Sequence, residues 1–405
     1  MLTGRRYLLR LTDEQAEYAE KVGAICRAVW NTALEQRREY RRRGAWISYV
    51  EQARQLAEAK KDPSCSWLAE APSHTLQQTL RDLEQACKTH GTWKPRWRSK
   101  SRTAPSFRFP DPKQITVRRL NRRWGELQLP KFGRVRFRWT RPLGGMIRNV
   151  TVSRDGVRWF VSFCVEDGLE EAPPNGKPPI GLDRGVAVAA VTSTGTFHDR
   201  QCVAPGEAKR LRRLQQGLSR SRRVHGRSTP SRRRQELRVQ LGRLHARIRA
   251  RRSDFVAQTA VRLVRNHGLV VVEDLRIKNM TASGKGGLGN PGSRVRQKAA
   301  LNRAILSKGW GALLLRLEHA GRYHGAAVIR VNPAYTSQTC NACRHTAREN
   351  RESQAAFRCG ACGYQAHADV NAAKNILAAG LAVTGRGDFA VGRSVKRQPL
   401  KGSIA

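Results

Sequence analysis

Residues 269–274, Leu-Val-Val-Val-Glu-Asp, combine an apolar, mostly β-branched run with two acids at its end. A short run of this composition is typical of a strand that is buried on both faces of a sheet. Residues 180–183, Ile-Gly-Leu-Asp, have a similar pattern and also end in an acid. Further elements are expected as strands at 186–192, near Phe197 and at 326–331, and as a helix at 298–323. This alternation of strands and helices predicts an α/β domain.

The residues before this domain have a different pattern. Residues 5–10 are predicted to form a strand, and helices are expected at 12–44, at 47–61 and from Ser73 onward. We therefore expect a helical insert at residues 11–90, placed directly behind an opening strand.

Short runs that alternate apolar and polar residues follow the helices, at 126–129, 134–139 and 158–165. Separated by glycine and proline, such runs predict a small antiparallel β-barrel, built from residues 1–10 and 91–168. Residues 169–179 are rich in proline and have the composition of a linker.

The chain is strongly basic. Its 405 residues include 77 Lys and Arg against 31 Asp and Glu, which gives a net charge of +46. A compact protein with this charge repels itself unless a polyanion neutralises it, and a small acidic metabolite cannot do so. The composition therefore predicts salt-dependent binding to nucleic acid.

Two segments concentrate this charge. Residues 209–252 contain 17 Lys and Arg and a single acid, Glu236, and their leucine spacing predicts a basic helical hairpin. Residues 94–158 contain 19 Lys and Arg, interleaved with tryptophan and phenylalanine from Trp93 to Trp159. Each of these aromatic residues either fills the barrel core or stacks on a base, and the sequence leaves both alternatives open.

The sequence has no membrane or secretion signal that we recognise. No stretch approaches the roughly 18 apolar residues of a membrane helix, and the N-terminus lacks the apolar run of a signal peptide. Five of the nine cysteines are scattered, as buried thiols of a reducing compartment are. We expect a cytoplasmic protein that does not bind a membrane.

The other four cysteines form the motif Cys340-x₂-Cys343-x₁₅-Cys359-x₂-Cys362. This is the spacing of a four-thiolate zinc ribbon, and four protein ligands close the tetrahedral shell of Zn²⁺. A structural zinc ion is therefore expected within residues 337–366. Arg344 is an irregularity, because it stands where a zinc knuckle often has glycine.

Three acids lie at the edges of predicted elements. Asp183 and Glu273 end strands, and Asp369 opens the helix Val370-Asn-Ala-Ala-Lys-Asn-Ile-Leu. Each acid alone could be a turn residue, a solvated strand end or an N-cap. Together they would face the crevice where α/β sheets bind ligands, and three carboxylates there repel one another unless divalent cations lie between them. Mg²⁺ or Mn²⁺ suits such oxygen ligands, and two ions would support phosphodiester hydrolysis.

The segments around these acids, Gly-Leu-Asp183-Arg-Gly-Val, Val-Val-Val-Glu273-Asp-Leu and His367-Ala-Asp369-Val-Asn-Ala-Ala-Lys-Asn-Ile, resemble the split RuvC nuclease of the TnpB family. The cysteine motif lies between the second and third segments, as it does in that family. TnpB proteins are transposon-encoded RNA-guided DNA endonucleases related to compact type V CRISPR effectors. The resemblance implies that Asp183, Glu273 and Asp369 bind two magnesium ions and are catalytic. The roles of Arg184 and His367 are left open.

The resemblance also implies a multi-domain fold of α/β and all-β parts. The barrel would be a wedge domain, and the helices at 11–90 a recognition lobe. An RNase H-like (RuvC) nuclease would comprise residues 180–336 and 367–385, with the zinc ribbon inserted. Residues 386–405 would be a basic, flexible tail.

The function implied is cleavage of target DNA, directed by a guide RNA and associated with a transposable element. The partners would be that RNA and target DNA in double-stranded and single-stranded form, with the oligomeric state undetermined. Two alternatives remain: an RNA-guided DNA-binding regulator that does not cut, and an RNase H-like transposase that needs no RNA.

Overall fold

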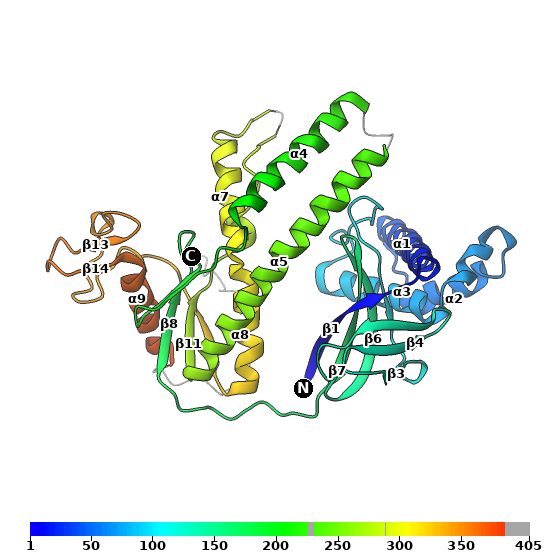
Figure 1. Ribbon diagram of the computed structural model, residues 1–405, viewed down its shortest axis with the longest axis horizontal. Coiled ribbons are helices and arrows are strands. Elements are labelled where there is room, and N and C mark those ends of the chain that lie inside the picture. The colour runs from blue at the N-terminus through cyan, green and yellow to red at the C-terminus, as the bar shows by residue number, and fades with distance from the viewer. Residues whose placement is uncertain (226–230, 288, 385–405) are drawn as a thin grey trace. The chain divides into compact units, whose positions relative to one another are not determined.

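A computed structural model describes residues 1–225, 231–287 and 289–384 (Figure 1). The tail predicted at 386–405 lies outside these residues. Contacts between residues divide the chain into two compact units. The first comprises residues 1–170 and 213–246, and the second comprises 171–212 and the residues from 247 onward.

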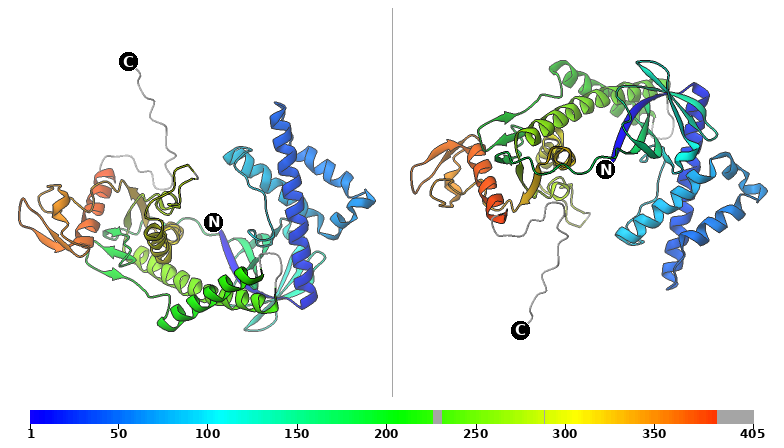
Figure 2. Two further views of the ribbon diagram at one scale, coloured as in Figure 1. Left: turned by 90° about the horizontal axis from the view of Figure 1, so that it is seen from above. Right: turned by 90° about the horizontal axis from the view of Figure 1, so that it is seen from below.

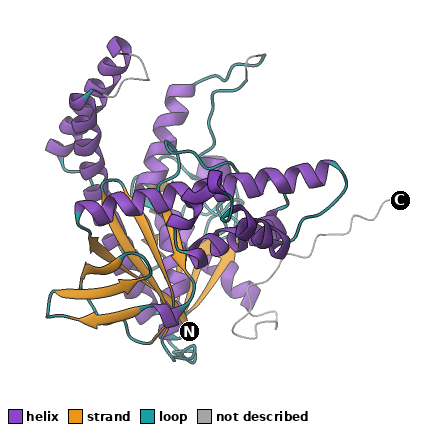
Figure 3. Ribbon diagram, turned by 90° about the vertical axis from the view of Figure 1, so that its right-hand side faces the viewer, coloured by secondary structure: helices purple, strands orange, loops and turns teal. Residues whose placement is uncertain are grey.

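The first unit contains a seven-stranded antiparallel sheet, whose long strands are orange in Figure 3. Its order is β2-β6-β7-β1-β5-β4-β3. The strands are β1 (Leu2–Arg10), β2 (Ser106–Phe109), β3 (Thr116–Arg119), β4 (Trp124–Leu129), β5 (Gly133–Arg138), β6 (Met146–Asp155) and β7 (Arg158–Glu166), with a short 3₁₀ helix η2 (Pro112–Gln114) between β2 and β3. The antiparallel strands predicted here are confirmed, whereas their closure into a barrel stays a prediction.

The alternation in these strands explains their packing. In β7, Trp159, Val161, Phe163 and Val165 are buried on one face. They join a core that also contains Phe107, Phe109, Phe132 and Phe137. Of the two alternatives that the sequence left open, core packing or stacking on a base, these aromatic residues therefore take core packing.

The helices of the first unit are α1 (Asp13–Arg42), α2 (Tyr49–Ala59), η1 (Pro63–Glu70) and α3 (Ser73–His90). Thr12 caps α1 in a capping box with Gln15, and the apolar residues from Ala19 to Leu34 bury one side of the helix. The helix α3 begins at Ser73, as predicted. Its N-cap is Pro72, whose side chain has no hydrogen-bonding group and makes no capping contact.

Two long helices form the basic segment, α4 (Pro205–His225) and α5 (Arg232–Asn266). Leu214 and Leu218 on α4 and Leu244 on α5 are buried, as the leucine spacing predicts. The helix α5 continues well beyond residue 252, the predicted end of the hairpin. Its last part is apolar at helical spacing, and Val256, Ala260 and Leu263 are buried in the core of the second unit.

The second unit contains a five-stranded sheet of order β10-β9-β8-β11-β12. The strands are β8 (Pro179–Asp183), β9 (Ala190–Thr192), β10 (Phe197–His198), β11 (Leu269–Glu273) and β12 (Ala327–Val331). The three strands β8, β11 and β12 are parallel, and the other two are antiparallel. The strand expected at 186–192 is therefore shorter than predicted.

Helices cover both faces of this sheet (Figures 1 and 2). On one face, Leu313 and Leu317 of α8 (Trp310–His324) and the end of α5 pack against Val270 and Val272. On the other, Ile376 of α9 (Ala368–Thr384) packs against Val271. The remaining elements are α6 (Ile277–Met280), α7 (Val295–Lys308), η3 (Arg348–Asn350), β13 (Ala356–Arg358) and β14 (Gln365–His367).

The single helix predicted at 298–323 is wrong. The structure has two helices there, α7 and α8, which are separated by Gly309. Gly309 has φ of +74°, in the left-handed region that glycine adopts without a steric penalty. The apolar spacing continues through this break, so it could not reveal where one helix ends. In the described part of the chain, no helix is long and apolar enough to cross a lipid bilayer.

Candidate functional site

Asp183 and Glu273 end two neighbouring strands. β8 and β11 pair in parallel, with Leu182 opposite Val272, and each acid follows directly as the last residue of its strand. The carboxyl ends of parallel strands meet at the same edge of a sheet. The two acids therefore stand side by side at that edge, as the sequence predicts.

Asp369 reaches the same place from α9. The helix packs so closely on β8 that a Cβ atom added to Gly181 would lie 2.0 Å from the carbonyl oxygen of Ala373. A Cβ added to Gly185, just after β8, would lie 3.9 Å from Oδ2 of Asp369. The absence of a side chain at Gly181 thus lets α9 bring its first turn to the end of β8.

The negative charges of the other two acids act on Asp183. Burial, together with the negative charges of Glu273 and Asp369, raises the pKa of Asp183 to about 7. Burial also raises the pKa of Glu273, although the Thr336 hydroxyl donates a 2.7 Å hydrogen bond to its Oε1 and opposes the shift. The structure therefore brings the three predicted carboxylates into one electrostatic site.

Two arginines adjoin this site. Arg351, from the loop between η3 and β13, donates from Nη2 to Oδ1 of Asp369 at 3.0 Å. Arg184 is buried and donates to the backbone carbonyl oxygens of Glu273 and Trp310. It therefore ties the end of β11 to the start of α8 and does not neutralise a carboxylate by direct contact. Sequence reasoning missed Arg351 and Thr336, because no local spacing marks residues that meet only in the fold.

His367 has a local contact. Its Nδ1 accepts a 3.2 Å hydrogen bond from the backbone N–H of Asp369, which fixes the ring at the start of α9. The ring also packs edge-on against Phe197, with centroids 4.9 Å apart. Both contacts support a structural role in the first turn of α9.

The four cysteines converge. Their sulfur atoms all lie within 4.8 Å of one another, with 3.8 Å between Cys340 and Cys362 and 3.5 Å between Cys343 and Cys359. Sulfurs bound tetrahedrally to zinc at about 2.3 Å would be about 3.8 Å apart. Among the described residues this is the one such cluster, so the three carboxylates are held less tightly together than the sulfurs.

The charges of the thiols fit a metal ion. Backbone N–H groups of Cys362 and Ala361 lower the pKa of Cys359 to about 6. The backbone N–H of Tyr364 lowers the pKa of Cys362, but the thiol of Cys343, burial, and the thiols of Cys359 and Cys340 outweigh it and raise this pKa to about 12. Ionisation of one thiol therefore makes ionisation of the next less favourable, and a cation would be required to keep all four as thiolates.

The irregular Arg344 is accommodated. It has φ of +65°, the left-handed conformation that favours glycine, and its Nη1 donates to Oδ1 of Asn375 at 3.3 Å. Its backbone N–H donates to the carbonyl oxygen of Cys340 at 3.0 Å, which closes the first knuckle. The contact with Asn375 links that knuckle to α9.

Two buried asparagines of α9 attach the ribbon to the helix that carries Asp369. Asn371 accepts from the N–H of Asn341 at 3.0 Å and donates to the carbonyl oxygen of Thr339 at 2.8 Å. Asn375 donates to the carbonyl oxygens of Thr336 and Thr339, at 3.0 and 2.7 Å. The cysteine cluster and the acid are therefore parts of one hydrogen-bonded assembly.

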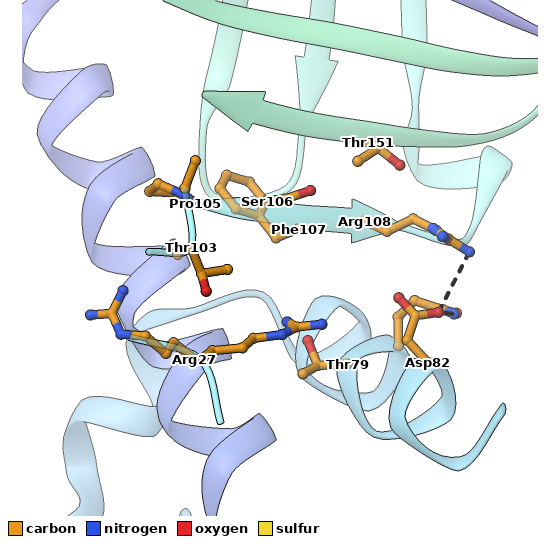
Figure 4. Close-up of a pocket in the computed structure, with 13 residues that line it drawn as sticks. Arg27, Thr79, Asp82, Thr103, Pro105, Ser106, Phe107, Arg108 and Thr151 are labelled. Carbon is orange, nitrogen blue, oxygen red and sulfur yellow. Dashed lines mark hydrogen bonds and ion pairs between the residues drawn. The ribbon is translucent and has the colours of Figure 1, made fainter. Parts of the chain in front are cut away.

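A separate cavity lies in the first unit. Its volume is about 180 Å³, and it lies between α1, α3 and β2 (Figure 4). Arg27, Arg98 and Arg108 line it, together with the hydroxyl groups of serine and threonine side chains. Nη1 of Arg108 lies 3.6 Å from Oδ1 of Asp82. A cavity lined in this way can accept phosphate or hydrogen-bond to a polar ring edge.

The fold of the chain is shared with a compact Cas12 effector. The structure described as "Cryo-EM structure of the Cas12f1-sgRNA-target DNA complex" aligns with 90% of this chain and 83% of that chain. The TM-score is 0.55 and the sequence identity is 13%. Both chains combine α and β structure.

Sequence relatives are more informative. The chain is 36% identical to the "Putative RNA-guided DNA endonuclease InsQ" of Escherichia coli (strain K12), over 98% of this chain and 97% of that protein. A "Putative RNA-guided DNA endonuclease" of Streptomyces pristinaespiralis is 32% identical, over 95% and 90%. The chain belongs to the TnpB family.

Three family models match consecutive parts of the chain. They are described as "Helix-turn-helix domain" at residues 1–45, "Probable transposase" at 162–284 and "Cas12f1-like, TNB domain" at 310–376. Residues 1–45 are all described by the structure, and they form the strand β1 and the single long helix α1. The last match contains the cysteine cluster and Asp369.

Proposed function

We propose that the chain is an RNA-guided DNA endonuclease, associated with a transposable element, which hydrolyses phosphodiester bonds of target DNA with two divalent cations. The observation that carries the proposal is that Asp183, Glu273 and Asp369 lie at one end of the sheet, where burial and the charges of the other two acids raise the pKa of Asp183 to about 7. The printed names of the relatives from Escherichia coli and Streptomyces support the guided reaction.

The donor set fits the metal ions that this reaction requires. Three carboxylates offer hard oxygen ligands for Mg²⁺ or Mn²⁺, and of the two nearby arginines only Arg351 contacts a carboxylate. Asp183, Glu273 and Asp369 would hold these ions, which when bound supply Lewis acidity and lower the pKa of water. Cys340, Cys343, Cys359 and Cys362 would hold a structural Zn²⁺.

The chain's own residues would set the position of the carboxylates. The hydroxyl of Thr336 holds Oε1 of Glu273, and Arg184 holds the backbone of the same residue. The close contact between Gly181 and α9 fixes Asp369. In this proposal residues 180–336 and 367–385 form a RuvC-like nuclease with the ribbon 337–366 inserted.

Guide RNA and target DNA would bind mainly through charge and shape, while base pairing would supply sequence specificity. The basic hairpin at 209–252, the helices at 11–90 and the wedge at 1–10 and 91–168 would contact the nucleic acids. The cavity lined by Arg27, Arg98 and Arg108 is a place where the first unit could read a short DNA motif beside the target.

The test is to purify the protein from cells that carry its native locus, at moderate salt, and to sequence the RNA that accompanies it. A DNA duplex matching the variable end of that RNA should be cut when Mg²⁺ is added. Changing the RNA sequence should redirect cleavage. Absence of RNA would contradict a guided function and favour an RNA-independent transposase, whereas guided binding without cleavage would favour a regulator.

A further inference from the structure

Residues 92–98, Thr-Trp-Lys-Pro-Arg-Trp-Arg, form a loop after α3 that we call the Trp loop. Its two tryptophans are exposed, Trp93 by 57% and Trp97 by 54%. They differ from Phe107, Phe109 and Trp159, which are buried in the core of the same unit. Large aromatic rings left in water at two positions of one short loop call for a partner.

The backbone of the Trp loop is fixed to α1. Four hydrogen bonds join them: Trp30 Nε1 to the Arg96 carbonyl at 3.1 Å, Asn31 Nδ2 to the Arg98 carbonyl at 2.9 Å, Arg98 N–H to Asn31 Oδ1 at 2.8 Å, and Arg38 Nη2 to the Pro95 carbonyl at 2.9 Å. Pro95 is itself buried. The backbone is thus held to α1 at Pro95, Arg96 and Arg98, on both sides of Trp97, while both indole rings stay exposed.

Positive charge lies close to the Trp93 ring. The guanidinium groups of Arg38 and Arg42 lie 6.0 and 5.7 Å from the centre of the Trp93 ring. Arg42 also pairs with two acids of α1, Glu35 and Glu39, which offset its charge.

The loop itself adds two further cations. The side chains of Lys94 and Arg96 are exposed between the two tryptophans. The loop therefore places two cations between two exposed indole rings within five residues.

We propose that the Trp loop is a stacking site for unpaired nucleobases of a bound RNA or DNA strand. Every base has a π-face that stacks on an indole ring, and the flanking phosphates would meet Lys94 and Arg96. An outward-facing aromatic pair with cations between its members matches a strand that alternates base and phosphate. The inference rests on the proposed function only in taking a nucleic acid as the partner.

The experiment compares Trp93→Ala, Trp97→Ala and the double variant with the wild-type full-length protein. Binding is measured by fluorescence anisotropy with three labelled oligomers of equal length: oligo-U, oligo-dT, and an abasic deoxyribose-phosphate oligomer. The third has the charges of a strand without its bases. Trp67→Ala is the matched control, since Trp67 is also an exposed tryptophan of this unit (39%) and lies on η1.

Wild type should bind oligo-U or oligo-dT more tightly than the abasic oligomer. The double variant should lose about tenfold in affinity per stacked base and retain its affinity for the abasic oligomer. The slope of log affinity against log salt should not change, because tryptophan carries no charge. Trp93→Tyr should bind the oligomers that carry bases nearly as tightly as wild type, in contrast to Trp93→Ala, because tyrosine keeps an aromatic face at this position.

A larger loss with oligo-U would assign the loop to guide RNA, and a larger loss with oligo-dT to a DNA strand. Equal affinity of wild type and double variant for all three oligomers would overturn the proposal, as would an equal loss with the abasic oligomer. A change of oligomeric state in the double variant, without a change in binding, would instead assign the loop to a protein contact. None of these measurements depends on cleavage, so failure here is separate from failure of the nuclease proposal.

Discussion

Arg351 of the cysteine-rich segment forms a 3.0 Å ion pair with Asp369, the acid that opens α9. A cation of the protein thus lies against one of three carboxylates that converge at the end of β8. This guanidinium offsets part of the negative charge that the three carboxylates bring together.

Replacing Arg351 should therefore change metal binding directly. In Arg351→Gln a competing positive charge is lost, so Mn²⁺ should bind about tenfold more tightly in the absence of nucleic acid. The binding can be followed by electron paramagnetic resonance of free Mn²⁺. Arg348→Gln, an exposed arginine of the same segment, is the control and should bind Mn²⁺ as wild type does. Unchanged affinity in Arg351→Gln would mean that Arg351 does not oppose the ion.

The raised pKa of Asp183 predicts how stability depends on pH without divalent ions. The folded protein holds a proton on this group up to about pH 7, whereas the unfolded chain releases it near 3.8. The folded state thus binds more protons between these values, and the free energy of unfolding should fall as pH rises from about 4 to 7. The loss is up to about 4 kcal/mol for a shift of about three pKa units.

Asp183→Asn should remove this dependence, because the amide does not ionise. In Mg²⁺-free buffer the variant should be more stable than wild type towards urea at pH 8, and the difference should shrink at pH 5. A difference of the same size at both pH values would show that Asp183 is not the group responsible.

The cysteine cluster should control both zinc content and the acidic site. Cys343→Ser should lose one zinc ion per chain, measured by mass spectrometry of the metal. Because Asn371 and Asn375 join this segment to α9, the variant should also lose metal-dependent cleavage. Cys202→Ser, outside the cluster, should retain both. Full zinc content in Cys343→Ser would contradict the assignment of this ligand.

The contact between β8 and α9 should be sensitive to one methyl group. In Gly181→Ala the added Cβ would lie 2.0 Å from the Ala373 carbonyl oxygen, so the helix must move. We expect a loss of about 1–3 kcal/mol in stability and weaker cleavage. Gly206→Ala, where the added Cβ meets nothing within 4 Å, should change neither. Thermal unfolding of the two variants compares them directly, and equal melting temperatures would contradict the close packing.

Much of the site could be predicted because its parts have local signatures. The strand ends at Asp183 and Glu273 follow apolar runs, and the spacing of the four cysteines predicts that their sulfur atoms meet. The contacts of Arg351 and Thr336 could not be predicted, since each depends on a loop that meets the site only after folding. The break at Gly309 was hidden for another reason: a left-handed glycine leaves the apolar spacing of its neighbours unchanged.

The most direct test of the central claim is to separate binding from cleavage at the three acids. Asp183→Ala, Glu273→Ala and Asp369→Ala should each bind guide RNA and target DNA as wild type does. Each should leave the DNA uncut in Mg²⁺, while Asp254→Asn, an exposed acid of α5, should cut normally. Cleavage at the wild-type rate by any of the three alanine variants would contradict a single centre built from Asp183, Glu273 and Asp369.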